Sequence, residues 1–327
     1  MADTHIEFQD FIKELDLRNG QEAKLQSSRD ALIGRITSHF GSKGLKSPRF
    51  ESQGSYALAT QNRPIDDDFD LDQGVYLQHY EDSASVSVHD AMTLIEDATN
   101  GHTSQPNPPK PTCVRVLYKA ASDGTPAHHV DLAVYREKAN GEKLYANRDN
   151  GWMASDQKGF IEHFKNNKSD QMHRLVRLLK GWADFNGGDD DSKMPSGFHL
   201  TVCVLECFVE SKDRDDKALV ETAEQILKRI QGAYIQKSGS PIIRPVIPNE
   251  DIFESFSFGR ITNFEAKLKT LLVEGNQALI SEKAKALSIW NTVFGDRFVA
   301  PQSGGDSKSR ELYTRPFTIG RHGEAGK

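Results

Sequence analysis

The chain has 327 residues, of which 41 are basic and 47 acidic, and its formal net charge is −6. A chain of this length can bury a substantial core, either as one bilobal unit or as two domains. Because its Lys and Arg residues are scattered and its net charge is negative, a long nucleic acid is disfavoured as its ligand. The three cysteines lack regular spacing, which argues against a disulfide framework and indicates a reducing compartment.

The N-terminal residues carry neither a basic region nor an apolar core, so we expect no secretory signal. No run of the sequence reaches the roughly 18 apolar residues that a membrane-spanning helix needs. We therefore expect a cytoplasmic protein that makes no contact with a membrane. In chain order, the apolar spacing predicts helices over 8–17 and 21–40, strands and a short helix over 48–77, and a helix over 86–98.

A Gly-Ser pair at positions 54 and 55 opens the short helix that is predicted within 48–77. Glycine lets a backbone approach a ligand closely, and the Ser55 hydroxyl adds a hydrogen-bond donor. Gly-Ser pairs open many helices, so this pair predicts a phosphate-binding turn only in combination with the acids that follow.

Asp70 and Asp72 lie two residues apart in the run Phe69–Leu77, which reads as a strand. Residues at this spacing face the same side of a strand, so the two carboxylates are expected to project together. Mg²⁺ prefers one or two carboxylates, with water and substrate phosphates as its other ligands. The pattern therefore predicts a magnesium site that serves a phosphate-bearing substrate.

The acids at 68, 70 and 72 also resemble the start of a calcium-binding loop. Such a loop demands glycine at its sixth position and a bidentate glutamate at its twelfth, where this chain has Gln73 and His79. We reject the calcium interpretation on these two positions.

Phosphoryl transfer with two metal ions needs a further acid. Asp131 interrupts an apolar, strand-like run over 129–135, which pairs as a predicted hairpin with 113–118. A buried aspartate is costly unless it is paired or metal-bound, so we assign Asp131 to the same site. We interpret His128 and His129 as residues that flank the strand rather than as ligands.

A short strand is predicted over 143–146, and the chain is then predicted to be helical from about residue 155. The helices are expected over 157–166, 170–186, 196–210, 214–233, 262–274 and 277–294. His199, Cys203 and Cys207 share one stripe of the third of these helices. A closed zinc site wants four ligands, and no partner segment is evident, so we interpret the stripe as buried packing.

Arg174, Arg177 and Lys180 recur every three residues on the helix over 170–186. They form a cationic strip that could face a triphosphate, for which Lys acts as a point charge. For Arg174 and Arg177 we favour the alternative, an ordinary solvated helix face.

Taken together, these motifs resemble the bacterial cGAS/DncV-like nucleotidyltransferases, polymerase-β-type enzymes that make cyclic oligonucleotide messengers in CBASS anti-phage defence. The resemblance covers about residues 50–300 and is closest to the cyclic GMP–AMP synthase branch. The segments that carry it are Gln53–Tyr56, Thr60, Asn62–Pro64, Phe69–Tyr76, His129–Leu132, Trp152–Asp156, Phe164, Arg174–Trp182 and Pro195–Gly197.

The resemblance implies an α+β fold with a bilobal polymerase-β-type core, in which a mixed sheet is packed with helices. A nucleotidyltransferase lobe with the N-terminal helices would span 1–155, a helical lobe 156–300 and a flexible tail 301–327. The implied cofactor is a pair of Mg²⁺ ions, for which Mn²⁺ can substitute. The implied metal-binding and catalytic residues are Asp70, Asp72 and Asp131, and the implied nucleotide-binding residues are Gln53, Gly54, Ser55, Lys180 and Ser196.

On this basis we expect ATP, GTP or both to be joined into a cyclic dinucleotide with release of pyrophosphate. Two alternatives stay open: nucleotide addition to RNA ends or to a small hydroxylated acceptor, and a silent nucleotide-binding regulator. The resemblance also implies partners encoded in the same operon, including a ubiquitin-transfer-like protein that joins the synthase C-terminus to other molecules. This chain ends in Lys327 after Gly326, where conjugation would favour a terminal glycine.

Overall fold

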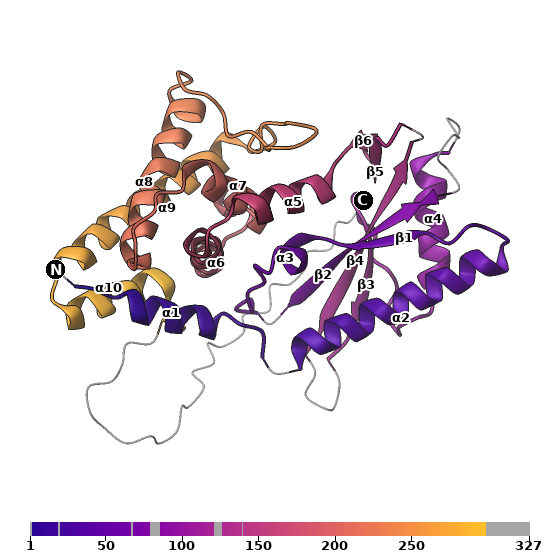
Figure 1. The fold of residues 1–327 in the computed structure, drawn as a ribbon, viewed down its shortest axis with the longest axis horizontal. Helices are drawn as coiled ribbons and strands as arrows, with labels where there is room; N and C mark the ends of the chain where they lie inside the picture. Colours follow the sequence, from indigo (N-terminus) through magenta and orange to yellow (C-terminus); the bar gives the residue numbers. More distant parts are fainter. Residues whose placement is uncertain are drawn as a thin grey trace, which may run out of the picture.

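The computed structural model describes residues 2–18, 20–66, 68–78, 86–120, 126–138 and 140–298. A mixed sheet with its covering helices forms one side of the molecule, and a group of helices forms the other (Figure 1). This arrangement confirms the predicted α+β fold with a polymerase-β-type mixed sheet and a helical C-terminal part. The tail predicted over 301–327 lies outside the described residues. Among the helices that the structure describes, none is long and apolar enough to cross a membrane.

Six strands form the sheet, and β4 is its central element because it pairs with three others, β2, β3 and β5. The order β1-β2-β4-β5-β6 forms the main path, and β3 pairs with β4 off this path. The β2–β4 pair is parallel, whereas the other pairs are antiparallel. The strand bounds are β1 Arg49–Ser52, β2 Phe69–Leu77, β3 Val114–Tyr118, β4 His128–Glu137, β5 Lys143–Asn147 and β6 Gly151–Ala154. The predicted hairpin is therefore present as the antiparallel pair β3–β4.

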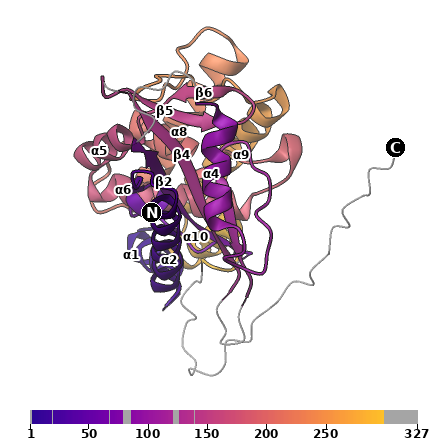
Figure 2. The ribbon, with the colours of Figure 1, turned by 90° about the vertical axis from the view of Figure 1, so that its right-hand side faces the viewer.

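One face of the sheet is covered by α2 (Gln21–Ser42) and α4 (Val88–Thr99), which pack against each other (Figure 2). Apolar residues alternate along β2 and β4, so one set of side chains enters this core while the other set faces the opposite way. Phe69 and Leu71 of β2 and Val130 and Leu132 of β4 are buried beneath the two helices. Asp70, Asp72 and Asp131 therefore lie on the face that is turned toward the other helices.

The remaining helices form a second core. They are α1 His5–Glu14, α5 Gln157–Asn167, α6 Asp170–Phe185, α7 Gly197–Cys207, α8 Asp215–Ile230, α9 Phe258–Ile280 and α10 Lys283–Phe294, with a 3-10 turn at Asp190–Ser192 and a π-helical turn at Gln231–Ile235. Cys203 and Cys207 are buried in this core, as the packing interpretation predicts.

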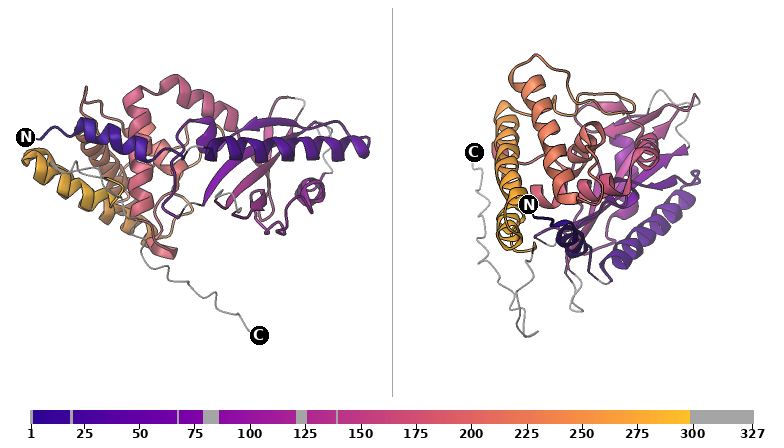
Figure 3. Two further views of the ribbon diagram at one scale, coloured as in Figure 1. Left: turned by 90° about the horizontal axis from the view of Figure 1, so that it is seen from below. Right: turned by 60° about the vertical axis from the view of Figure 1, so that its left-hand side comes forward.

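The N-terminal helix α1 contributes to this second core although the chain then continues into the sheet part (Figure 3). The ring of Phe8 lies 4.9 Å from that of Trp290 and 5.7 Å from that of Phe294, centroid to centroid. The domain boundary that we place at residue 155 stays a prediction. Helix α1 belongs to the predicted first lobe by sequence, but it packs in the core of the C-terminal helices.

The structure corrects one predicted break. We expected separate helices over 262–274 and 277–294, but α9 runs without interruption through Gly275 and ends at Ile280. Gly275 packs so closely on α8 and α10 that an added Cβ would lie 2.6 Å from Val220 and 3.2 Å from Trp290. The helix therefore continues through Gly275, where the absence of a side chain permits a close helix–helix contact.

Candidate functional site

Three carboxylates meet where β2 and β4 run side by side in parallel. In the register of this pair Asp72 is opposite Asp131, and Asp70 is opposite His129. Directly paired residues of neighbouring strands point to the same face, so all four side chains project together. Ligand atoms of Asp70, His129 and Asp131 all lie within 4.8 Å of one another. The structure thus brings together the three acids that the sequence analysis assigns to one site.

The charges at this site require compensation. Burial, together with the neighbouring Asp70 and Asp131 carboxylates, raises the pKa of Asp72 to about 7. Arg115 of β3 holds Asp131 through two hydrogen bonds, from Nε to Oδ1 at 2.8 Å and from Nη2 to Oδ2 at 2.7 Å. The cations of Arg115 and Lys180 do not balance three ionised carboxylates, and a divalent cation would neutralise the remaining negative charge. The donor set therefore fits a metal site.

Gly54 lets the backbone turn from β1 into the short helix α3 (Gly54–Ala57) directly against Asp72. Its φ of +58° lies in the left-handed region. A Cβ added at this position would overlap the Asp72 carboxylate. The Gly-Ser turn is therefore held against one of the acids, in the combination that the sequence analysis requires.

Two adjoining cavities open on either side of Asp72. The lysine cavity, of about 360 Å³, is lined by Gly54, Ser55, Leu58, Thr60, Asp70, Asp72, Gln157, Phe160, Ile161, Lys180, Ser196, Gly197, Phe198 and Thr201. The tyrosine cavity, of about 350 Å³, shares Gly54, Asp72, Gln157 and Phe198 with it and is further lined by Asp131, Tyr135, Tyr145, Arg244, Glu250 and their neighbours. The lysine cavity thus contains Ser55, Lys180 and Ser196, which the sequence analysis assigns to nucleotide binding.

Lys180 supplies the positive charge of the lysine cavity. Its Nζ donates a hydrogen bond of 2.6 Å to the carbonyl of Thr60. Burial lowers the pKa of this ammonium to about 8; the Asp70 and Asp72 carboxylates oppose the shift, whereas Arg177 adds to it. The ammonium is therefore poised beside the acids, ready for an anionic ligand.

The other two cations of the same helix have different partners, and the solvated helix face that we expected for them is wrong. Arg174 forms two hydrogen bonds with the fully buried carboxylate of Asp215, at 2.6 and 2.8 Å. Arg177 is itself buried and binds Asp16 at 2.8 Å and the Asn62 side chain at 3.0 Å. Both arginines join α6 to neighbouring segments, because burial of a cation is tolerated only when it is paired.

Gln53 and Ser196 occupy two different surroundings. The Gln53 amide donates to the hydroxyl of Tyr76 and accepts from that of Tyr135, each at 3.2 Å, and the residue does not line the lysine cavity. Gln53 instead lines the tyrosine cavity and the larger cavity beside α3, and its assignment to the donor nucleotide stays a prediction. Ser196, just before α7, lines the lysine cavity, and its hydroxyl lies 2.7 Å from Nδ1 of His199.

Two residues that lie in this region were assigned no role in the site from the sequence. His129 is buried within β4, so our interpretation of it as a flanking residue is wrong. The signal was available, because His129 and Asp131 have the same i, i+2 spacing as Asp70 and Asp72. Arg244 is buried in the wall of the tyrosine cavity, with its guanidinium over Phe160 and Phe198. No local pattern in the sequence marks Arg244, because it comes from a long connection after α8.

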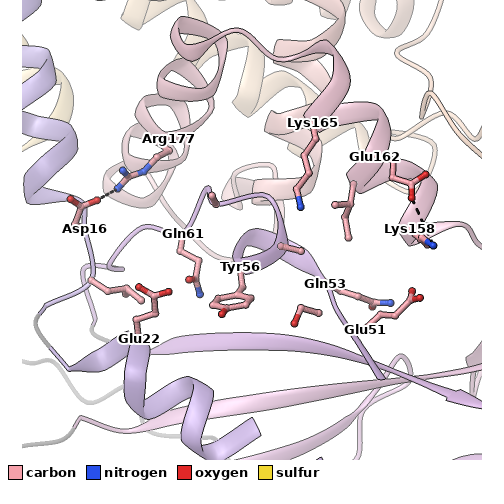
Figure 4. A pocket seen from close by; sticks show the side chains of 15 residues that line it. Asp16, Glu22, Glu51, Gln53, Tyr56, Gln61, Lys158, Glu162, Lys165 and Arg177 are labelled. Carbon is pink, nitrogen blue, oxygen red and sulfur yellow. Dashed lines mark ion pairs between the residues drawn. The ribbon is translucent and has the colours of Figure 1, made fainter. Parts of the chain in front are cut away.

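A larger cavity of about 990 Å³ lies on the other side of the β1–α3 segment and contains none of the three aspartates (Figure 4). Its charged residues are mixed in sign, and Asp16 with Arg177 and Lys158 with Glu162 form ion pairs within it. Figure 4 shows Tyr56 and Gln53 on its floor and Lys165 on the opposite wall. The chemistry that we assign to the acids is therefore confined to the two smaller cavities.

Comparison with known proteins is consistent with this geometry. Residues 48–135 match the family described as cyclic GMP-AMP synthase DncV-like, nucleotidyltransferase domain. A curated relative, the cyclic GMP-AMP synthase of Escherichia albertii, is 28% identical over 200 residues, which are 58% of this chain and 44% of the relative. The match thus spans less than half of that relative's length.

Solved structures share the fold at low sequence identity. The Vibrio cholerae DncV cyclic AMP-GMP synthase in complex with nonhydrolyzable GTP has a TM-score of 0.75 and 16% identity, covering 92% of this chain and 98% of that one. CdnC of E. coli MS115-1 with ATP has a TM-score of 0.68 and 15% identity over 91% and 99% of the two chains. The Bradyrhizobium diazoefficiens CD-NTase CdnG in complex with GTP has a TM-score of 0.70 and 16% identity over 90% and 96%.

Proposed function

Because the chain belongs to the bacterial cGAS/DncV-like nucleotidyltransferases, we propose that it joins two nucleoside triphosphates into a cyclic dinucleotide and releases pyrophosphate. The observation that supports this most is the position of Asp72 at the junction of two cavities of similar volume. A donor triphosphate would occupy the lysine cavity, and an acceptor nucleotide would occupy the tyrosine cavity. The carboxylates would then lie between the reacting groups.

Each residue of the lysine cavity has a role in this proposal. Ser55 and Ser196 would donate hydrogen bonds to the triphosphate, and the Lys180 ammonium would neutralise part of its charge. Gly54 would let the backbone approach the phosphates while it leaves room for Asp72. Positioning and charge neutralisation are the main contributions that a protein makes to phosphoryl transfer.

Asp70, Asp72 and Asp131 would hold the divalent ions, which we expect to be two Mg²⁺ with Mn²⁺ as a substitute. When bound, these ions would neutralise the reacting phosphates and lower the pKa of the attacking ribose hydroxyl. Asp131 is the acid on the tyrosine-cavity side, so it would lie nearest that hydroxyl. After the first transfer, the linear product would turn over in the site and a second transfer would close the ring.

The test is to incubate the purified full chain with radiolabelled nucleoside triphosphates and Mg²⁺ or Mn²⁺. We expect pyrophosphate and a phosphatase-resistant cyclic product, with ATP and GTP as the preferred substrates. The D70A/D72A double variant should form no product while it remains folded and unfolds cooperatively in denaturant. D97A/D149A, which removes two exposed acids elsewhere, should keep full activity.

The same assay separates the alternatives. Nucleotide addition only when RNA or a small hydroxylated acceptor is supplied would overturn the cyclase proposal in favour of a template-independent transferase. An intact protein that binds nucleotides but releases no pyrophosphate would be a regulator. We further propose a second-messenger role in anti-phage defence, which requires D70A/D72A to abolish any protection that the gene and its operon partners give to bacteria.

A further inference from the structure

The side chain of His129 is oriented by one acid and lies against two others. It is only 7% exposed, and its Nδ1 lies 3.3 Å from Oδ1 of Asp68, which precedes β2. A carboxylate can only accept a hydrogen bond, so this contact places the ring proton on Nδ1. Nε2 has no hydrogen-bond partner within the described parts of the chain.

The other ring nitrogen points into the acidic site. Nε2 lies 4.0 Å from Oδ2 of Asp70 and 4.0 Å from Oδ2 of Asp131. With the proton on Nδ1, Nε2 turns a lone pair toward two carboxylates, and a cation bound between these groups would relieve their repulsion. Ligand atoms bound at about 2.1 Å to one small ion are about 3 to 4 Å apart, so the spacing suits such an ion.

We propose that Nε2 of His129 is a ligand of a divalent metal ion that Asp70 and Asp131 also bind. The arrangement has the form that metal-binding histidines usually take, in which the second ring nitrogen donates to a carboxylate that fixes the ring. The role of Asp68 is then to position His129. The inference deepens the proposed function, on which it rests for the presence of a metal.

A nitrogen ligand changes which ions the site prefers. Mg²⁺ favours an all-oxygen environment, whereas imidazole binds first-row transition ions more readily. His129 should therefore raise the affinity of the site for Mn²⁺ relative to Mg²⁺. In this respect the site would differ from one made of three carboxylates alone.

Arg115 does not block this assignment. It occupies one acceptor position on each oxygen of Asp131, through bonds of 2.8 and 2.7 Å. A carboxylate has about four such positions, so Oδ2 can face Arg115 and a metal ion at the same time. Asp70, with a side chain that is 47% exposed, leaves the ion open to water and to substrate phosphates.

The test reads the metal directly, by pulsed electron paramagnetic resonance of Mn²⁺ added to the nucleotide-free full chain. An imidazole nitrogen bound to Mn²⁺ gives a characteristic ¹⁴N modulation. We expect this modulation in the wild type and its loss in H129Q, whose amide keeps a polar atom near the same place. H129Q should also bind Mn²⁺ at least about tenfold more weakly in calorimetry, with a smaller change for Mg²⁺.

Two further variants complete the design. D68N should weaken Mn²⁺ binding less than H129Q, and it should keep the ¹⁴N signal because it only loosens the ring. H89Q removes an exposed histidine of α4 and should leave both readouts unchanged. Bound Mn²⁺ without ¹⁴N modulation in the wild type, or the same modulation in H129Q, would refute the role of His129. Either result would leave the cyclase proposal standing, because that proposal is judged by its products with Mg²⁺.

Discussion

The Asp72 carboxylate is packed directly against the Cα of Gly54, with no room between them for a methyl group. We expect G54A to displace either the carboxylate or the α3 backbone. A displacement of about 1 Å in a reacting group can cost about 100-fold in rate, so turnover should fall at least that far. Steady-state pyrophosphate release measures the loss.

G44A is the matched control for this variant. Gly44 also has a positive φ, of +67°, but an added Cβ would meet nothing within 4 Å. Both alanine variants should lose about 1 to 2 kcal/mol of unfolding free energy through backbone strain. Only G54A should lose turnover, and an equal effect of both on turnover would show that strain, and not the contact with Asp72, is responsible.

Nucleotide affinity should depend on the charge of Lys180. Because burial lowers the pKa of this ammonium to about 8, the free protein loses the charge as the pH rises through that value. Binding of a nonhydrolysable ATP analogue should be nearly constant below about pH 7 and weaken as the pH rises through about 8. K180R should remove this decline, since arginine stays charged.

K180M should bind the analogue about ten to a hundred times more weakly at pH 7, because a charge-assisted contact is lost. Its affinity should also be independent of pH between 7 and 9.5. Titration calorimetry at several pH values makes the measurement. The same decline above pH 8 in the wild type and in K180M would assign the effect to another group.

The unfolding free energy of the metal-free protein should change with pH as the Asp72 carboxyl loses its proton. Its pKa is raised to about 7 in the folded state, mainly by burial, whereas the ordinary value is 3.8. The folded protein therefore holds this proton more tightly than the unfolded chain. The stabilisation is complete below about pH 4 and is lost as the pH rises through about 7.

D72N removes this titration and should be more stable than the wild type at pH 8 by about 1 to 3 kcal/mol, since one pKa unit corresponds to about 1.4 kcal/mol. Urea unfolding in EDTA at pH 5, 6, 7 and 8 makes the comparison. D149N, at an exposed acid, should follow the wild type throughout. A D72N advantage that does not grow between pH 5 and pH 8 would contradict the assignment.

Removal of the Phe8 ring should destabilise the helical core, although Phe8 lies far in the sequence from the C-terminal helices that form most of that core. Phe8 is fully buried and packs edge-on against Trp290. F8A should cost about 3 to 5 kcal/mol in unfolding free energy. F258A, at a ring that is 66% exposed, should cost less than about 0.5 kcal/mol. Equal losses in the two variants would argue against α1 as a core element.

Local patterns in the sequence were sufficient to predict most helices, the strand with Asp70 and Asp72, and the acid at position 131. Each of these rests on a spacing of two residues or on a helical period. The partners of buried cations could not be predicted in this way. Asp215 binds Arg174 across 41 positions of the chain, and no local rule couples two residues at that separation.

Register was the other missing information. From the sequence alone, His129 is interpreted as a residue that flanks a strand and not as a ligand. The proximity of His129 to Asp70 follows only from the parallel register of β2 and β4, which pairs these two residues directly. The break expected near Gly275 was wrong for a related reason, because a glycine in a helix can serve a contact with another helix as well as a turn.

The position of α1 also governs how the two halves of the protein can move. The polypeptide crosses between them twice, once after α1 and once between β6 and α5. Contacts add to these two connections, because Leu58, which follows α3, is buried in the helical core. Any separation of the two halves would therefore also have to break the hydrogen bonds from Lys180 to the carbonyl of Thr60 and from the Asn62 side chain to the carbonyl of Arg177.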